Sequence, residues 1–171
     1  MGHDFDGDQT MSTLYVDNLE PNLGSQVEIP DLKPLAGSVV QDVVGYNDTQ
    51  YASPATSVYV DTFSFSINNC IAGSHVIVEC DPAGLMENAG NVTYVIFKGS
   101  TELGHTRHSG TGNGGWRTAP TMIRGTDTNV TSGTNTYTLK FYSTGPYMYV
   151  NYNYPDGYRC VSSYRMTEIA Q

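Results

Sequence analysis

Histidine and cysteine are the side chains that most often bind metal ions, and two histidines of this sequence lie close together. His105 and His108 are three positions apart, next to Arg107, while His75 and the three cysteines lie elsewhere. Zinc sites commonly use Cys-x-x-Cys or His-Glu-x-x-His spacings, and neither occurs here. We therefore predict surface histidines in a turn, no metal site and no cofactor. The odd number of cysteines does not suit a disulfide framework, so we predict free, buried thiols.

Catalysis by a nucleophile or by an acid–base pair requires side chains at defined spacings, and the sequence shows none of the common patterns. It holds no Gly-x-Ser-x-Gly motif, and Ser109 next to His108 is adjacency along the chain without triad geometry. The glycine-rich stretch 110–115 lacks the Lys-Ser/Thr ending of a phosphate loop. Asp and Glu are so numerous that a close pair would not indicate glycoside hydrolysis. We predict no catalytic residues and no enzymatic activity.

The start of the chain is acidic and patternless. Asp4, Asp6 and Asp8 superficially resemble a calcium-binding loop, but the glycine among them lies at the wrong position and no glutamate follows at the required distance. We predict that residues 1–10 are a disordered lead, with Met11 as an alternative start.

Aromatic side chains next to planar donors are suited to binding sugars, and the sequence offers such residues in two places. Trp116 is followed by Arg117 at the end of the glycine-rich stretch. Tyr147 and Tyr149 belong to a tyrosine-rich stretch near the C-terminus, and tyrosine is common at contact surfaces. These four residues are the candidate contacts to a glycan or another surface. For Trp116, packing in the core or between subunits is the competing interpretation.

The overall composition favours strands and excludes two classes of partner. Gly, Tyr, Thr, Ser, Val and Asn are abundant, only 15% of the residues are charged, and no window shows apolar residues at helical spacing. The net charge is −9, with no cluster of Lys or Arg to replace phosphate counterions or to dock on an anionic membrane. No stretch approaches the roughly 18 apolar residues of a membrane span. We predict an all-β protein that binds no nucleic acid and inserts into no membrane.

Alternating apolar residues predict nine strands after residue 37. The predicted strands are residues 38–44, 58–67, 74–80, 92–97, 102–107, 120–124, 137–142, 147–152 and 160–169. The residues predicted to face the core are Phe63, Phe65, Ile67, Val76, Val78, Cys80, Tyr137, Leu139 and Phe141. Glycine and proline at 143–146 predict a turn, so that the last three strands follow one another in one antiparallel sheet.

Long connections separate several of these strands, so neighbours in the chain need not be neighbours in a sheet. Residues 81–91 and 125–135 are predicted to be such connections. Tight hairpins together with long crossings favour a two-sheet β-sandwich of the jelly-roll type. An immunoglobulin-like sandwich is the alternative, but the chain lacks its Cys-Trp-Cys spacing. The predicted head domain comprises residues 37–171.

A separate segment, residues 11–36, precedes this domain. Alternating apolar residues predict two short strands around a turn, and three prolines exclude the segment from the middle of a sheet. The segment is too short to form a core of its own. Its apolar residues are therefore predicted to pack against sister chains in a homotrimer, or against a docking partner. These residues are Leu14, Val16, Leu19, Val27 and Ile29.

Several short motifs, spread along the chain, occur together and in a fixed order. They are Met-Ser-Thr-Leu-Tyr-Val-Asp-Asn-Leu at 11–19, Val-Glu-Ile at 27–29, Gly-Ser-Val-Val-Gln at 37–41, Tyr-Val-Ile-Phe-Lys-Gly-Ser-Thr at 94–101, Asn-Thr-Tyr-Thr-Leu-Lys at 135–140 and Met-Thr-Glu-Ile at 166–169. In this pattern, which spans nearly all of residues 11–170, the chain resembles the fibre-like virion proteins of tailed phages, especially of marine cyanophages.

The resemblance implies a structural protein of the virion, made in the cytoplasm of a bacterial host. Such proteins have an N-terminal anchor that binds other virion proteins of the capsid or tail, and a C-terminal β-sandwich head, often as a homotrimer. A tail fibre of this kind would carry a long shaft, of which this chain has almost none, so a short fibre or knob-like appendage is the better match. Its head would contact a host surface glycan. The alternative function, from a different class, is a carbohydrate-binding module of the jelly-roll type.

Overall fold

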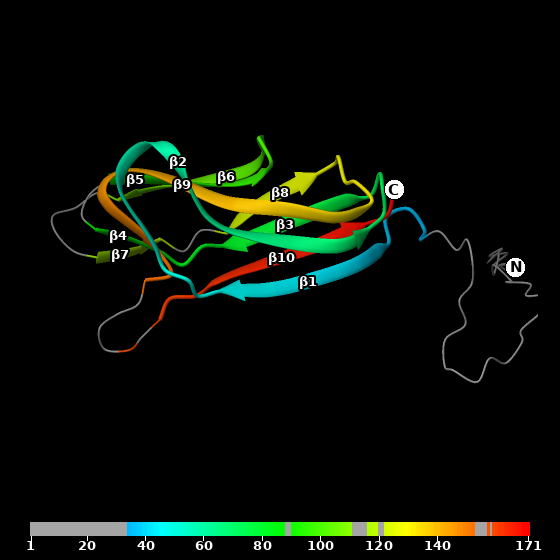
Figure 1. Ribbon diagram of the computed structural model, residues 1–171, viewed down its shortest axis with the longest axis horizontal. Helices are drawn as coiled ribbons and strands as arrows, with labels where there is room; N and C mark the ends of the chain where they lie inside the picture. Colours follow the sequence, from blue (N-terminus) through cyan, green and yellow to red (C-terminus); the bar gives the residue numbers. More distant parts are fainter. Residues whose placement is uncertain (1–33, 88–89, 111–115, 120–121, 153–156, 158) are drawn as a thin grey trace, which may run out of the picture. The chain divides into compact units, whose positions relative to one another are not determined.

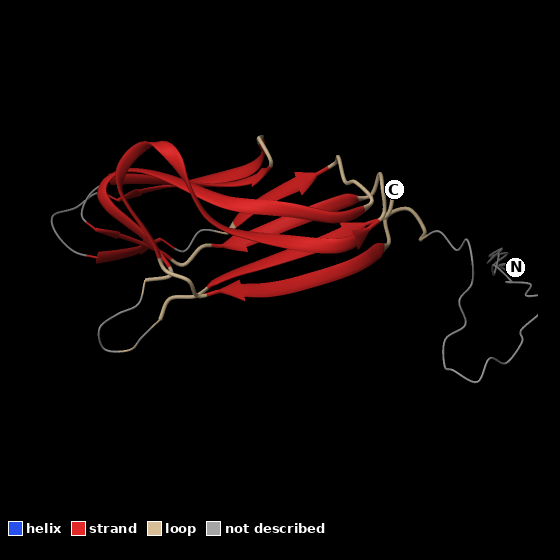
Figure 2. Cartoon of the chain, viewed as in Figure 1, coloured by secondary structure: helices blue, strands red, loops and turns tan. Residues whose placement is uncertain are grey.

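The computed structural model describes residues 34–87, 90–110, 116–119, 122–152, 157 and 159–171. The chain divides into two units, Met1–Lys33 and Pro34–Gln171, and the described residues belong to the second. They form strands, turns and bends and no helix (Figure 2). This part of the chain accordingly has no helix that is long and apolar enough to cross a membrane. The all-β prediction is confirmed for the described residues.

The described residues form two antiparallel sheets (Figure 1). Their strands are β1 (Val39–Asn47), β2 (Tyr51–Cys70), β3 (His75–Asp81), β4 (Gly84–Glu87), β5 (Gly90–Lys98), β6 (Thr101–Gly110), β7 (Trp116–Ala119), β8 (Ile123–Asp127), β9 (Gly133–Val150) and β10 (Ser162–Ile169). Sheet A has the order β1-β10-β3-β8. In sheet B, β9 pairs with β2 along one edge and with β5 and then β4 along the other. β6 extends the sheet beyond β5, and β7 extends it beyond β4.

The chain passes repeatedly from one sheet to the other. It runs from β1 in sheet A to β2 in sheet B, returns to β3, continues through β4 to β7 in sheet B, and then alternates through β8, β9 and β10. The first and last strands thereby become neighbours, with pairs from Val39↔Ile169 to Asn47↔Ser162. This winding of two sheets around one core is that of a jelly roll. The predicted jelly-roll-like sandwich is confirmed.

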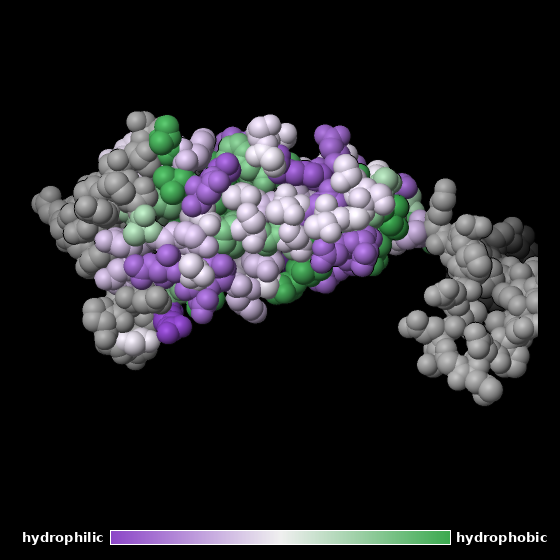
Figure 3. Space-filling model, in the orientation of Figure 1, coloured by the Kyte–Doolittle hydropathy of each residue, from purple (hydrophilic) through white to green (hydrophobic). Residues whose placement is uncertain are grey.

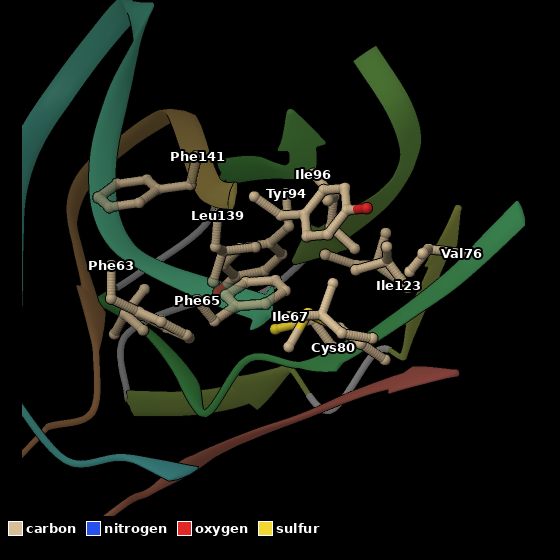
Figure 4. Close-up of a cluster of buried hydrophobic side chains, with 14 of the residues drawn as sticks. Phe63, Phe65, Ile67, Val76, Cys80, Tyr94, Ile96, Ile123, Leu139 and Phe141 are labelled. Carbon is tan, nitrogen blue, oxygen red and sulfur yellow. The ribbon is translucent and has the colours of Figure 1, made fainter. Parts of the chain in front are cut away.

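Alternation of apolar and polar residues directs one face of each main strand into the core between the sheets (Figure 4). β3 buries every second residue, and β9 does the same from Asn135 to Ser143. All residues predicted to face the core are buried. Burial stabilises by about 1.5–3 kcal/mol for each large apolar side chain, so this core is the main source of stability.

The cysteines are free, as predicted. Cys70 and Cys80 are buried in the core, and Cys160 is half-buried. Burial raises the pKa of the Cys80 thiol to about 12 and also raises the pKa of Cys70. Both core thiols therefore stay protonated at neutral pH and act as small apolar side chains.

The end of the chain differs from the predicted succession of three neighbouring strands. A turn is predicted at 143–146, but β9 runs through this stretch as one strand, and β10 lies in the other sheet. Proline is tolerated here because the ladders on both sides of β9 break. On one side of β9, its ladder with β2 has pairs at Ser143 and then at Tyr147, with none between them. On the other side, the ladder with β5 ends at Ser143 of β9, and the ladder with β4 begins at Tyr147 of β9. Pro146 falls in this gap, so it interrupts no regular ladder.

Two short strands lie where the sequence predicts loops. β4 falls within the predicted connection 81–91, and β7 falls at the end of the glycine-rich stretch. They pair with each other, and β4 also pairs with β9. Each has four residues, which is too few to give a period-2 pattern in the sequence.

Contact between β6 and β8 closes one side of the sandwich. A Cβ on Gly104 of β6 would lie 2.3 Å from the backbone oxygen of Arg124 in β8. A Cβ on Gly125 would lie 2.8 Å from the carbonyl carbon of Leu103. Both positions require glycine because no methyl group fits between the two backbones. As a result, β6 covers the edge of sheet A that β8 forms.

Candidate interaction surfaces

A buried carboxylate fixes the end of the sandwich at which β1 begins. Glu168 of β10 is fully buried. Its Oε1 accepts hydrogen bonds from the Ser74 hydroxyl at 2.5 Å and the Ile71 N–H at 2.7 Å, and its Oε2 accepts one from the Gln41 amide at 2.6 Å. Burial raises the pKa of Glu168, but these hydrogen bonds outweigh burial and hold the pKa below its usual value. The charged carboxylate therefore ties the β2–β3 turn to β1 and β10.

A second buried carboxylate, Asp127, lies in the same row of sheet A as Glu168, two strands away. It accepts hydrogen bonds from Lys98 Nζ at 2.5 Å and from the Tyr137 hydroxyl at 3.0 Å, both of which belong to sheet B. Burial, and then the charge of Asp127, raise the pKa of Tyr137. Asp127 therefore joins the two sheets. Every buried side-chain polar atom among the described residues has a hydrogen-bond partner.

Asn151 joins the loops at the opposite end of the sandwich. Its side-chain nitrogen donates to the Asn47 side chain at 2.8 Å and to the Thr49 carbonyl at 3.0 Å. Its side-chain oxygen accepts from the N–H and the hydroxyl of Ser162, and its backbone N–H donates to the Ala83 carbonyl at 2.9 Å. Asn151 has φ 58°, a left-handed conformation that asparagine adopts more readily than most residues. Glu168, Asp127 and Asn151 therefore serve the fold, and the candidate interaction surfaces described below lie on the outside of the described domain.

The first such surface is the β1 edge, by which we mean the free side of strand β1 (Val39–Asn47). Among the described strands, β1 forms a ladder with β10 alone, whereas β6 covers the opposite edge of sheet A. Val44 and Tyr46 are 58% and 72% exposed, and a hydrophobic patch lies over β1 along the lower side of the domain in Figure 3. Edge strands are usually protected by Lys or Pro, and β1 has neither. The β1 edge is therefore suited to pairing with another strand.

The charges next to the β1 edge are paired within sheet A. Arg165 donates to Asp42 Oδ1 and Oδ2, the shortest contact being 2.9 Å. Arg165 thereby lowers the pKa of Asp42, with a further contribution from Thr167. In the same row, Glu79 lies 3.8 Å from Arg124. Because these charges pair with one another, apolar contacts dominate what the β1 edge offers to a partner.

A second surface is the outer aromatic cluster of Tyr59, Phe97 and Tyr142 on sheet B. The Tyr59 ring meets Phe97 at 5.5 Å and Tyr142 at 5.4 Å, both edge to face. Lys140 lies 5.1 Å over the Phe97 ring, a cation–π contact, and 2.9 Å from Asp61. Burial, and then the charge of Glu102, raise the pKa of Tyr59. These ring contacts hold the part of β2 around Tyr59 against β5 and β9.

The four predicted glycan or surface contacts lie in one part of sheet B. Trp116 and Tyr147 fall in one row of the β7-β4-β9 ladder. Arg117 falls in the next row, and Tyr149 in the row after it. The Tyr149 ring packs edge to face on Tyr152 at 5.0 Å. Because successive rows belong to opposite faces of a sheet, the rows of Trp116, Tyr147 and Tyr149 belong to one face, whereas the row of Arg117 is that of the buried Met148. The backbone therefore brings three of the four positions together on one face. The side chains of Trp116, Arg117 and Tyr147 lie outside the described part.

The predicted anchor residues Leu14, Val16, Leu19, Val27 and Ile29 lie outside the described residues. Within the described ranges, no group of three or more His, Cys, Asp or Glu side chains is placed to hold a metal ion. His105 lies in β6 rather than in a turn, and its Nδ1 lies 2.6 Å from Glu102 Oε1.

Sequence reasoning missed the β1 edge and the outer aromatic cluster. The sequence predicts a strand at 38–44, but its paired valines do not alternate, so the pattern shows neither its exposed face nor its place at an edge. The aromatic cluster combines β2, β5 and β9. Tyr59 reaches it where the β2–β9 register shifts between Thr56 and Val60, which no local pattern indicates.

The chain matches no protein-family model and no curated protein. Solved structures that resemble it include one of infectious bursal disease virus, Gx strain, with a TM-score of 0.36 and 13% identity, covering 85% of this chain and 42% of that chain. The Gt strain of the same virus gives 0.29 and 17%, covering 89% and 41%. The VP2 subviral particle of that virus gives 0.25 and 17%, covering 87% and 44%. This chain spans less than half the length of these virus chains, and its fold assignment rests on its own strand order.

Proposed function

We propose that this protein is a structural protein of a virus particle, and that it forms a short trimeric appendage on a phage capsid or tail. The strand order of the two sheets carries the proposal, because the jelly roll β1-β10-β3-β8 against β2-β9-β5-β6 is an architecture used by capsid and lectin domains. The motifs in residues 11–170 that resemble fibre-like virion proteins of tailed phages give the class.

The use of polar groups inside the domain supports a role in assembly. Among the described residues, Glu168 and Asp127 are the buried carboxylates, and both join strands through hydrogen bonds. Assembly therefore depends on the outer surfaces. In this proposal residues 11–36 attach the protein to other virion proteins, and the acidic head is exposed outside the particle, where it contacts a host surface glycan.

Two measurements test the proposal. Mass spectrometry of purified particles from the virus that encodes this chain is expected to find the chain in the particle fraction. Light scattering is expected to give three chain masses for the full chain and one for a chain that begins at Pro34, which retains the Ser38 N–H to Leu35 carbonyl bond at 2.9 Å. Absence from purified particles overturns the virion role, and a monomeric full chain overturns the trimer.

A carbohydrate-binding module is the second candidate, because the register places Trp116, Tyr147 and Tyr149 in rows of the same face of the β7-β4-β9 ladder. Trp116 and Tyr147 are two strands apart in one row, which separates their backbones by about 10 Å. Saturable binding in a glycan array, lost in Trp116→Ala and kept in the control Tyr142→Ala, supports this candidate. Equal binding by both variants, or no binding at all, contradicts it.

A further inference from the structure

We propose that the β1 edge receives an extended strand, residues 12–20, from a neighbouring copy of this chain, and that this exchange holds the homotrimer together. The inference deepens the proposed function and rests on it for the number of copies. It assigns an acceptor on the described domain and a donor in the segment that precedes it.

The acceptor is distinguished from the other edges of the sandwich. β8 is covered by β6 through Gly104 and Gly125. In sheet B, the outer strand β6 lies against β8 through the same contact, and the outer strand β7 has only four residues. β2, which flanks β9, contains Pro54 and four register shifts along its ladder with β9, and a short strand, a Pro and register shifts all blunt a sheet edge. β1 has 9 residues and no Pro, and its ladder with β10 is irregular only at its start, between Val39 and Gln41. The edge that lacks protection is thus the one placed to accept a strand.

Both faces of β1 offer apolar contacts to an added strand. Val43 packs against the core cluster on the inner side, and Val44 and Tyr46 are exposed on the outer side. Side chains directly opposite each other on adjacent strands lie about 4.5–5.5 Å apart, which is close enough for apolar pairs. A donor with apolar residues on both faces is therefore required.

Residues 12–20 meet this requirement better than the other apolar stretch of the segment. They match the length of β1 (9 residues) and contain neither Pro nor Gly. In an extended conformation, Leu14 and Val16 fall on one face and Tyr15 on the other. The second stretch, around Val27 and Ile29, is stopped at once by Pro30.

The length of chain between donor and domain allows an exchange between copies. Residues 21–33 reach up to roughly 43 Å at about 3.3 Å per residue. A domain of this size has a radius of gyration of roughly 14 Å, so the linker extends past one domain to the next. The chain enters the domain next to β1, where the Gly37 N–H donates to the Ala170 carbonyl at 2.7 Å. A head-to-tail exchange of this kind forms a cyclic trimer when the rotation between successive copies closes after three.

Light scattering on full-length variants tests donor and acceptor separately. Val16→Pro removes an N–H from the donor, and Val44→Lys places a charge on the acceptor. Each is expected to reduce the measured mass from three chains to one. Gln26→Pro, which lies outside residues 12–20 and outside the predicted trimer contacts, is the control for the donor, and Thr126→Lys, an exposed position on β8 in sheet A, is the control for the acceptor. Both controls are expected to keep three chains, and circular dichroism verifies that every variant is folded.

Amide hydrogen exchange provides the second readout. In the full chain, amides of β1 are expected to exchange at least tenfold more slowly than in Val16→Pro. Three results overturn the inference: a trimer that persists in both Val16→Pro and Val44→Lys, a trimer lost in Val44→Lys but kept in Val16→Pro, or a monomeric full chain whose β1 amides exchange faster in Val16→Pro. The second result indicates direct β1-to-β1 pairing, and the third indicates that the segment covers its own edge. The proposed virion role fails separately, when the chain is absent from purified particles.

Discussion

At the scale of single residues, Glu168 shows how hydrogen bonds keep a buried carboxylate charged. It receives one backbone and two side-chain hydrogen bonds in a fully buried position. Because its pKa in the folded state is lowered, its contribution to stability is present above the carboxyl pKa of the unfolded chain, about 4.3. That contribution is lost as the pH falls through the lower pKa of the folded state.

We predict that Glu168→Gln lowers the free energy of unfolding by about 1–3 kcal/mol at pH 7, since an amide replaces an oxygen that accepts a hydrogen bond. The difference from the natural protein is expected to shrink as the pH falls below about 4.3, because protonation of the Glu168 carboxyl group removes its charge-dependent contribution to stability, whereas the glutamine amide does not titrate. Urea denaturation between pH 7 and 3 measures both effects. Asp81→Asn, at an exposed position, is the control. A constant difference across this range contradicts the prediction.

Gly45 provides space for a stacked ring. A Cβ at this position would lie 2.2 Å from the Tyr164 hydroxyl oxygen, and the Tyr164 ring cannot move freely because it stacks on Phe65 at 4.6 Å. We predict that Gly45→Ala destabilises the protein by about 1–3 kcal/mol through overpacking. In a double-mutant cycle, the same change in a Tyr164→Leu background is expected to cost at least 0.5 kcal/mol less, by the usual coupling of ~0.5–3 kcal/mol between contacting residues. Equal costs in both backgrounds argue against this contact.

At the scale of strands, the sequence predicts which residues face inward better than it predicts which strands are neighbours. Phe63, Phe65 and Ile67 alternate with polar residues, so their burial follows from strand geometry alone. Pro146 is misread as part of a turn, because its tolerance depends on where β5 ends and β4 begins along β9. That arrangement is set by contacts between distant parts of the chain. Local patterns therefore give strands and faces, while pairing requires the whole fold.

The contact between β6 and β8 makes a prediction at this scale. Gly104→Ala places a methyl group against the Arg124 backbone oxygen, which cannot rotate away as a side chain does. We expect it to destabilise the protein more than Gly45→Ala and to speed amide exchange in β8. Since Gly125 faces the same contact from the other strand, the double variant Gly104→Ala with Gly125→Ala is expected to cost less than the sum of the single changes. Strict additivity in urea denaturation contradicts a shared contact.

At the scale of the whole molecule, the candidate surfaces were only partly predictable. Composition and charge lead us to expect no nucleic-acid or membrane partner, and apolar alternation in residues 11–36 leads us to expect that this segment packs on a partner. The β1 edge could not be predicted, because its exposure follows from the order β1-β10-β3-β8 and from the covering of β8 by β6. The donor is thus visible in the sequence, and the acceptor only in the fold.

This division of roles leads to a prediction for thermal unfolding. If copies are joined by exchange of residues 12–20, unfolding of the full chain also separates the copies, so its Tm rises with protein concentration. A chain that begins at Pro34 lacks the donor and is expected to show the same Tm at every concentration, as is full-length Val44→Lys. Calorimetry over a hundredfold range of concentration measures this difference. A full chain whose Tm is independent of concentration contradicts the exchange, because the β1 edge would then be covered within one copy or not at all.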